Sequence, residues 1–151
     1  VDPWFIVDSA PDEAKLIRMA RLVNDKKPNF VLNKIDCAVS LIGRSKMELK
    51  IACLGLAFKP DIDDLRESPA LSIMRKISLM GFSEVLLAEP NIFTLPKEFK
   101  DKEQLVSLVL ADEAIRAADI VVLLVDHTPF KSIDLGLLSG KQIIDTRGIW
   151  S

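Results

Sequence analysis

The sequence contains few of the residues on which disulfide scaffolds and metal sites depend. Its 151 residues include one histidine, His127, and two cysteines, Cys37 and Cys53, with no Cys-x-x-Cys pair. Two cysteines are too few for a disulfide framework, and the simplest interpretation is a reduced, cytoplasmic protein. No cluster of Cys, Asp or Glu at ligand spacing surrounds the histidine, so we expect no metal site.

Glycine-rich nucleotide motifs are also missing. The six glycines are scattered, and neither Gly-x-Gly-x-x-Gly nor Gly-x-x-x-x-Gly-Lys-Ser/Thr occurs. We therefore expect that a complete dinucleotide site cannot be built from this sequence alone.

Long apolar runs and strong net charge are absent as well. The formal net charge of −2 provides no basic field for a nucleic acid. No uncharged apolar window of about 18 residues is present, so no membrane-spanning helix is expected. Residues 1–4 lack a basic region followed by an apolar one, so they do not resemble a signal peptide. The length suits one domain with an appendage.

Hydrophobic periodicity predicts two amphipathic helices after an irregular entry at residues 1–10. The first helix starts after Pro11, and the second runs from about Asn29 to Ile42 and ends at Gly43. Two helices cannot bury their apolar faces fully on one small sheet. We therefore expect residues 1–45 to form a helical dimerisation segment that packs against a second copy of the chain.

From residue 46 onward, short apolar runs alternate with helical patterns. The expected strands share a high content of aliphatic residues and lie at 49–54, 84–88, 104–109, 120–125 and 142–144. The expected helices lie at 69–78, 112–118 and 133–138, the first of them capped by Ser68-Pro69. This alternation predicts an α/β fold whose open, mostly parallel, Rossmann-like sheet has about five strands.

The densest group of charges follows the first expected strand, in Gly-Leu-Ala-Phe-Lys-Pro-Asp-Ile-Asp-Asp-Leu-Arg-Glu-Ser-Pro-Ala at 55–70. A strand-to-helix turn with cations and a new helix N-terminus is suited to holding an anion. Lys59 can pair with a phosphate while Phe58 covers a base or sugar. The alternative is a solvated lysine beside a core phenylalanine.

The other charged residues near the expected carboxyl edge have competing interpretations. Asp63 and Asp64 are interpreted as structural, since acidic groups near a helix start usually act as caps, and Asp64 can pair with Arg66. Arg147 follows the last expected strand, where its guanidinium could grip a phosphate or sugar hydroxyl, or lie unengaged on the surface.

Residues 55–70 carry a resemblance to a known family. The run is similar to the signature of the C-terminal domain of nucleotide-sugar 6-dehydrogenases, NAD-dependent enzymes that oxidise the C6 alcohol of a UDP- or GDP-sugar to a carboxylate. Three further segments resemble most the branch that acts on UDP-N-acetylmannosamine: 2–5, 89–91 and 125–127. The resemblance runs nearly end to end, but it covers only the later part of such an enzyme.

The resemblance implies a role for several residues. Phe58, Lys59 and Arg147 would contact the UDP-sugar, and Arg66 would reach an NAD held mainly by another domain. Asp2 would follow a nucleophilic cysteine that is expected upstream, and would orient water or stabilise charge in the second of two hydride transfers. The family also implies a homodimer formed through a long helix, a role in polysaccharide biosynthesis, and a UDP-binding domain at 46–151. We expect the 151-residue chain alone to be inactive, because it lacks the NAD domain and the nucleophilic cysteine.

Other interpretations remain open at this stage. Cys37 and Cys53 lack a glycine-rich turn or a nearby histidine, so both are interpreted as inert packing residues. His127 is interpreted as a turn residue bonded to Asp126 or to backbone. The whole chain could instead be a non-catalytic nucleotide-sugar-binding and dimerisation module. A flavodoxin-like receiver domain would require an aspartate in another sequence context than that of Asp126.

Overall fold

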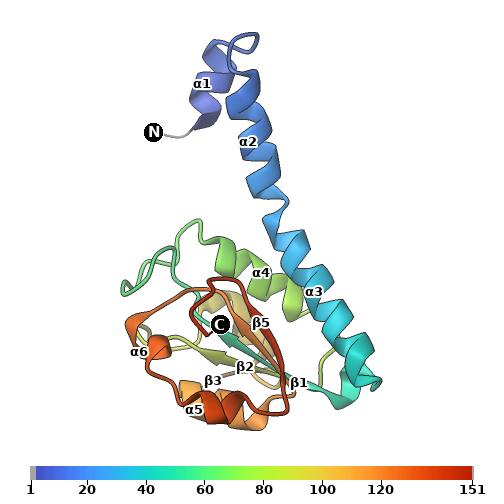
Figure 1. Cartoon of the computed structure of the whole chain (residues 1–151). Helices are drawn as coiled ribbons and strands as arrows, with labels where there is room; N and C mark the ends of the chain where they lie inside the picture. The colour runs from blue at the N-terminus through green and yellow to red at the C-terminus, as the bar shows by residue number, and fades with distance from the viewer. Residues whose placement is uncertain (1–2, 151) are drawn as a thin grey trace.

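Five parallel strands form one open sheet in the computed structural model, which describes residues 3–150 (Figure 1). The strand order is β3-β2-β1-β4-β5, and every neighbouring pair is parallel. The strands are β1 (Lys50–Leu54), β2 (Glu84–Ala88), β3 (Val106–Leu108), β4 (Ile120–Leu123) and β5 (Gln142–Asp145). The predicted α/β fold with a parallel sheet of about five strands is confirmed.

Alternate side chains of the central strands face two separate apolar layers, as a pleated strand requires. Ile51 and Cys53 of β1 face the layer that contains α3 and α4, whereas Ala52 and Leu54 face the layer that contains α5. All four residues of β4 are buried. Covering of both faces explains why these strands are continuous apolar runs rather than alternating ones.

The helices surround the sheet on both faces and continue into an arm (Figure 1). They are α1 (Pro3–Ser9), α2 (Lys15–Asp25), α3 (Lys27–Ile42), α4 (Pro69–Ile77), α5 (Ala111–Ala117) and α6 (Thr128–Lys131), with short 3₁₀ turns η1 (Lys46–Glu48), η2 (Lys97–Lys102) and η3 (Leu135–Leu138). Two predicted signals hold: Ser68 caps α4 by accepting a hydrogen bond from the Leu71 N–H, and Gly43 ends α3 with a φ of 72°.

The arm differs from the sequence-based expectation. Residues 1–10 were expected to be irregular, but Pro3–Ser9 is helical and packs on α2, burying Val7. Pro3 is compatible with a helix start because its missing N–H has no intrahelical acceptor there. Three helices therefore precede the sheet. No residue of α2 is buried, and the helix stands away from the sheet (Figure 1).

Two segments near the C-terminal end also differ from expectation. Residues 133–138 were expected to be a helix but contain only the 3₁₀ turn η3, whose first turn is capped by the Asp134 carboxylate. The four-residue helix α6 was not predicted, because it spans little more than one turn of about 3.6 residues and so cannot show a repeating hydrophobic pattern. Across residues 3–150, no helix combines the length and apolar character needed to cross a membrane.

Candidate ligand site at the carboxyl edge of the sheet

The strand order reverses between β1 and β4, and in open α/β sheets ligands bind beside such a reversal, at the carboxyl ends of the strands. The loops that leave these two strands touch at their bases. Gly55 has a φ of 88°, and a methyl group on it would lie 2.5 Å from Cβ of Val125 and 2.8 Å from the Val125 nitrogen. Only glycine allows the two chain segments to lie this close together. The β1–α4 loop (55–68) begins at this contact and leads to α4.

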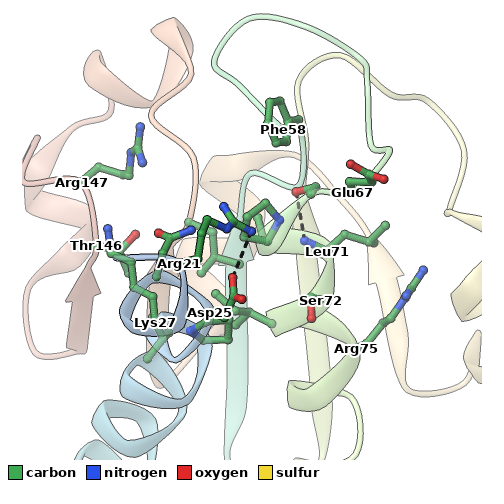
Figure 2. A pocket seen from close by; sticks show the side chains of 18 of the residues that line it. Arg21, Asp25, Lys27, Phe58, Glu67, Leu71, Ser72, Arg75, Thr146 and Arg147 are labelled. Carbon is green, nitrogen blue, oxygen red and sulfur yellow. Dashed lines mark hydrogen bonds and ion pairs between the residues drawn. The ribbon is translucent and has the colours of Figure 1, made fainter. Parts of the chain in front are cut away.

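A cavity of about 990 Å³ lies on the α3/α4 side of this edge, beneath the junction of α2 and α3. This volume is at the upper end of the range for ligand pockets, about 300–1,000 Å³. Figure 2 shows Phe58 and Arg147 on two sides of the cavity, with Arg21 and Asp25 between them. The lining therefore comes from the arm, from the β1–α4 loop and from the turn after β5.

The lining of the cavity carries more positive than negative charge. Four cationic side chains and two carboxylates are among its residues: Arg21, Lys27, Arg75, Arg147, Asp25 and Glu67. Residues 68–73 of α4 and its cap also line the wall. The first peptide N–H groups of a helix attract anions. Cations and a helix N-terminus together make this cavity suited to a phosphate-bearing ligand.

Arg147 is fixed in place by a carboxylate. Its Nε donates to Asp126 Oδ1 over 2.6 Å, and its backbone N–H donates to Asp145 Oδ1 over 2.8 Å. Partial burial is the largest single influence on the pKa of Asp126 and acts to raise it, but the hydrogen bond from Arg147, a backbone hydrogen bond and the nearby positive charges of Arg147 and Lys131 together lower the pKa. Within residues 3–150, the two terminal nitrogens of this guanidinium have no hydrogen-bond acceptor. They form a pair of parallel donors, suited to a phosphate.

Two of the predicted site residues, Phe58 and Arg147, line this cavity, and two do not. Phe58 is 50% exposed, so the core-phenylalanine alternative is wrong. Lys59 leaves the same edge of the sheet but is exposed and does not line the cavity; its Nζ lies 5.8 Å from the centre of the Phe58 ring. The predicted Asp64–Arg66 ion pair is present.

Arg66 lies outside the cavity, bound by Asp64. Its Nε donates to Asp64 Oδ1 over 2.9 Å and its Nη2 to Oδ2 over 2.7 Å. These side-chain hydrogen bonds are the main reason that the pKa of Asp64 is lowered to about 2. The side chain of Arg66 is otherwise exposed, so it could turn toward a ligand that approaches from solvent.

The remaining predicted residues have varied outcomes. Asp2 lies outside the described residues. Cys53 is buried, which raises the pKa of its thiol to about 12 and supports the packing interpretation. Cys37 is exposed on α3, so the same interpretation is wrong for it. In the part of the chain that the structure describes, no group of three His, Cys, Asp or Glu side chains is placed to hold a metal ion.

Sequence reasoning missed a buried pair beneath the β1–α4 loop. Glu89, which follows β2, and His127, which follows β4, have fully buried side chains. Glu89 Oε2 lies 3.0 Å from His127 Nε2 and also accepts from the backbone N–H of Leu56 (2.6 Å) and Ala57 (3.1 Å). The Asp61 N–H donates to His127 Nδ1 over 2.9 Å, so the predicted bond of the histidine to backbone is confirmed, but its carboxylate partner is Glu89 rather than Asp126.

Strand order is the signal that could have revealed this pair. Glu89 directly follows β2 and His127 lies four residues after β4, the two strands that flank β1, so parallel pairing places both beside the turn after β1. Burial acts to raise the pKa of Glu89, but hydrogen bonds from His127, Leu56 and Asn91 outweigh it and the pKa is lowered. The carboxylate therefore remains charged in the interior.

Residues 52–151 match the UDP-binding domain of the UDP-glucose/GDP-mannose dehydrogenase family. The chain belongs to this family, and the resemblance seen in the sequence is confirmed.

Individual relatives agree with the family match. An NDP-N-acetyl-D-galactosaminuronic acid dehydrogenase from Ralstonia solanacearum is 50% identical over all of this chain and 34% of its own length. A UDP-N-acetyl-D-mannosamine dehydrogenase from Salmonella typhi is 47% identical over 99% of this chain and 36% of its own length. The chain thus spans about a third of the length of these curated relatives.

Solved structures show the same fold. The UDP-D-ManNAc dehydrogenase of Pyrococcus horikoshii aligns over 98% of this chain and 33% of its own, with a TM-score of 0.78 and 29% identity. A UDP-N-acetyl-mannosamine dehydrogenase from Staphylococcus aureus aligns over 99% of this chain and 33% of its own, with a TM-score of 0.74 and 28% identity.

Proposed function

We propose that this chain is the UDP-binding part of an NAD-dependent nucleotide-sugar 6-dehydrogenase, and that its substrate is UDP-N-acetylmannosamine. One observation carries the proposal: a cation-rich cavity lies beside the strand-order reversal, with the first turn of α4 in its wall. Relatives named for the oxidation of UDP- and NDP-linked acetylated sugars support the substrate class. In the proposed reaction the C6 alcohol becomes a carboxylate through two hydride transfers.

The proposed roles follow from position at the cavity. Arg147, held by Asp126, would donate hydrogen bonds to the diphosphate from its two terminal nitrogens. Phe58 would cover the base or the sugar, and the ammonium of Lys59 would approach the phosphates from the adjacent position on the same loop. We propose that Asp2 orients water or stabilises charge in the second oxidation step. We propose residues 46–151 as the UDP-binding unit and 1–45 as the dimerisation segment.

The residues present do not fit a complete NAD site. The turn after β1 is where an α/β fold usually offers peptide N–H groups to a dinucleotide, but the N–H groups of Leu56 and Ala57 are already bonded to Glu89. Arg66 is the one residue that we propose as an NAD contact, and it is engaged with Asp64. We therefore propose that NAD is bound mainly by a domain outside this sequence.

Titration of UDP into the purified 151-residue protein, followed by calorimetry, tests the binding role. Arg147→Ala should raise the Kd for UDP about tenfold to a hundredfold, because hydrogen bonds to charged groups contribute about 1.5–3 kcal/mol. Arg44→Ala is a matched control, since Arg44 pairs with Asp119 at the opposite edge of the sheet. Unchanged affinity in Arg147→Ala would contradict the proposal.

Catalysis is tested separately from binding. With UDP-N-acetylmannosamine and NAD supplied, the 151-residue protein should produce no NADH, because the proposed nucleophilic cysteine and the NAD domain are not part of it. Formation of NADH by this protein would overturn the assignment of the chemistry to other segments. We also propose that the enzyme is cytoplasmic, which the two free cysteines support. Membership of the family supports a further proposal, that the enzyme acts in polysaccharide biosynthesis.

We also propose that the arm pairs two copies of the chain. Large apolar side chains are exposed along α2 and α3, among them Leu16 (82%), Met19 (58%), Phe30 (60%) and Leu41 (76%). Sedimentation equilibrium should show a dimer that Met19→Glu and Phe30→Glu weaken. Phe93→Glu, on an exposed loop after β2, controls for the added charge. A monomeric wild-type protein would exclude this arrangement.

A further inference from the structure

We propose that Glu89 and His127 are positioning residues that hold the Phe58–Lys59 turn in its ligand-binding conformation. This inference rests on the proposed function, because Phe58 and Lys59 are assigned to the UDP-sugar there. The two side chains reach the turn from the strands on either side of β1. Neither side chain is exposed to solvent, so both act through the loop rather than by touching the ligand.

The turn is closed at one end and strained at its tip. The Phe58 N–H donates to the Asp64 carbonyl over 2.8 Å, which closes the segment 58–64. Asp61 lies at the tip with a φ of 60°, a left-handed conformation that costs an aspartate about 1 kcal/mol. A strained residue keeps such a conformation only where its surroundings enforce it, so the contacts of Asp61 are informative.

Three hydrogen bonds hold the tip. The Asp61 N–H donates to His127 Nδ1 over 2.9 Å, and the Asp61 carboxylate accepts from the Thr128 N–H (2.8 Å) and hydroxyl (2.7 Å). The base of the loop is held at the same time, because Glu89 accepts from the N–H groups of Leu56 and Ala57. One buried pair therefore restrains both ends of the segment that carries Phe58 and Lys59.

The contacts also fix the tautomer of His127. A peptide N–H can only donate, so Nδ1, which faces the Asp61 N–H, must carry a lone pair. The proton of the neutral ring is then on Nε2, which donates to the Glu89 carboxylate 3.0 Å away. The amide nitrogen of Asn91 lies 3.2 Å from Nδ1 and is a second donor to it. The opposite tautomer would place two protons against each other.

Two substitutions separate positioning from simple structural support. Asparagine at 127 places its carbonyl oxygen near the position of Nδ1 and keeps the bond from Asp61, but loses the bond to Glu89. Glutamine reaches the position of Nε2 and keeps the bond to Glu89, but leaves the Asp61 N–H without its acceptor. His127→Gln should raise the Kd for UDP about tenfold, since the loop loses a buried hydrogen bond.

His127→Asn should lower the melting temperature more than His127→Gln does, because it removes the side-chain donor to a buried carboxylate and leaves only backbone N–H groups to stabilise its charge. Its Kd for UDP, measured well below the melting temperature, should stay within about threefold of wild type. If the Kd for UDP rises in proportion to the fall in melting temperature in both variants, the proposal is overturned and His127 has only a structural role.

A second pair of variants covers the case in which both changes at 127 prevent folding. Asp61→Ala, at an exposed position, should weaken UDP binding, and Asp61→Asn should restore much of it, since asparagine also tolerates left-handed backbone and can accept from Thr128. Unchanged affinity in Asp61→Ala would overturn the proposal.

Nuclear magnetic resonance provides a readout that needs no ligand. His127 is the sole histidine of the chain, so its ring nitrogens can be assigned directly, and they should report the Nε2–H tautomer. The amides of residues 58–64 should be ordered in wild type and His127→Asn but broadened in His127→Gln. Finding the Nδ1–H tautomer, or no difference between the variants, overturns the proposal. Absence of UDP binding by wild type would refute only the proposed function.

Discussion

Replacing Gly55 by alanine tests the contact on which the position of the ligand loop depends. Gly55 joins the end of β1 to the β1–α4 loop, and its N–H donates to the Ala88 carbonyl over 2.9 Å. An added methyl group would lie 2.5 Å from Cβ of Val125 and 2.8 Å from its nitrogen. Contacts this short against backbone cannot be relieved by rotating a side chain, so the loop itself would have to move.

The expected cost has two parts. A φ of 88° places alanine in left-handed backbone, which costs about 1–2 kcal/mol. Forcing a methyl group against a packed strand costs a further 1–3 kcal/mol, by the usual magnitude of overpacking. We therefore expect Gly55→Ala to lower the free energy of unfolding by about 2–5 kcal/mol, which corresponds to about 7–14 °C in melting temperature for the middle of that range.

Gly81→Ala isolates the first part. Gly81 has a φ of 81°, but a methyl group there would meet no atom within 4 Å, so only backbone strain of about 1–2 kcal/mol should remain. Urea denaturation of both variants, followed by circular dichroism, gives the difference. If Gly55→Ala and Gly81→Ala are equally stable, the two loops do not touch at the strand-order reversal and the reasoning is wrong.

Two further predictions concern buried groups. Folding lowers the pKa of Glu89 below its ordinary value of 4.5, so its charge stabilises the fold fully above that pH, and the contribution is lost as pH falls through the folded pKa. In urea titrations wild type should therefore lose more stability than Glu89→Gln as the pH is lowered below 4.5. A thiol reagent should modify one cysteine, Cys37, in the native protein and both after unfolding, because burial raises the pKa of Cys53 to about 12; two reactive thiols in the native state would contradict the burial of β1.

The elements that could be predicted from sequence are those with local causes. The run 84–88 was predicted with the bounds that β2 has, and β4 was predicted from six consecutive apolar residues. Ser68-Pro69 identified the start of α4, since a capping hydroxyl and a proline in the first turn act within one helical turn. The Asp64–Arg66 pair was also within reach, as its members are two residues apart.

Features that depend on strand order could not be predicted in this way. The bond between Glu89 and His127 joins residues 38 positions apart, and the bond from Asp61 to His127 joins residues 66 apart. Neither pairing has a local cause, since each exists only once β2, β1 and β4 lie side by side. Likewise, the sequence could place Phe58 and Lys59 in one turn, but not tell that only Phe58 lines the cavity.

Asp126 provides the sharpest test of how the cavity would bind a diphosphate, because two physical effects predict opposite signs. Asp126→Asn removes a negative charge near the proposed anion, which should tighten UDP binding by about 0.5 kcal/mol or less at physiological salt. It also weakens the 2.6 Å bond that orients Arg147.

Orientation should prevail in Asp126→Asn, because a hydrogen bond between charged groups contributes about 1.5–3 kcal/mol and its loss lets the guanidinium rotate. We therefore expect the Kd for UDP to rise about fivefold or more in calorimetry. Combined with Arg147→Ala, Asp126→Asn should cause no further loss, since the carboxylate acts through that guanidinium. Tighter UDP binding in the single variant would mean that net charge, rather than a fixed pair of donors, attracts the ligand.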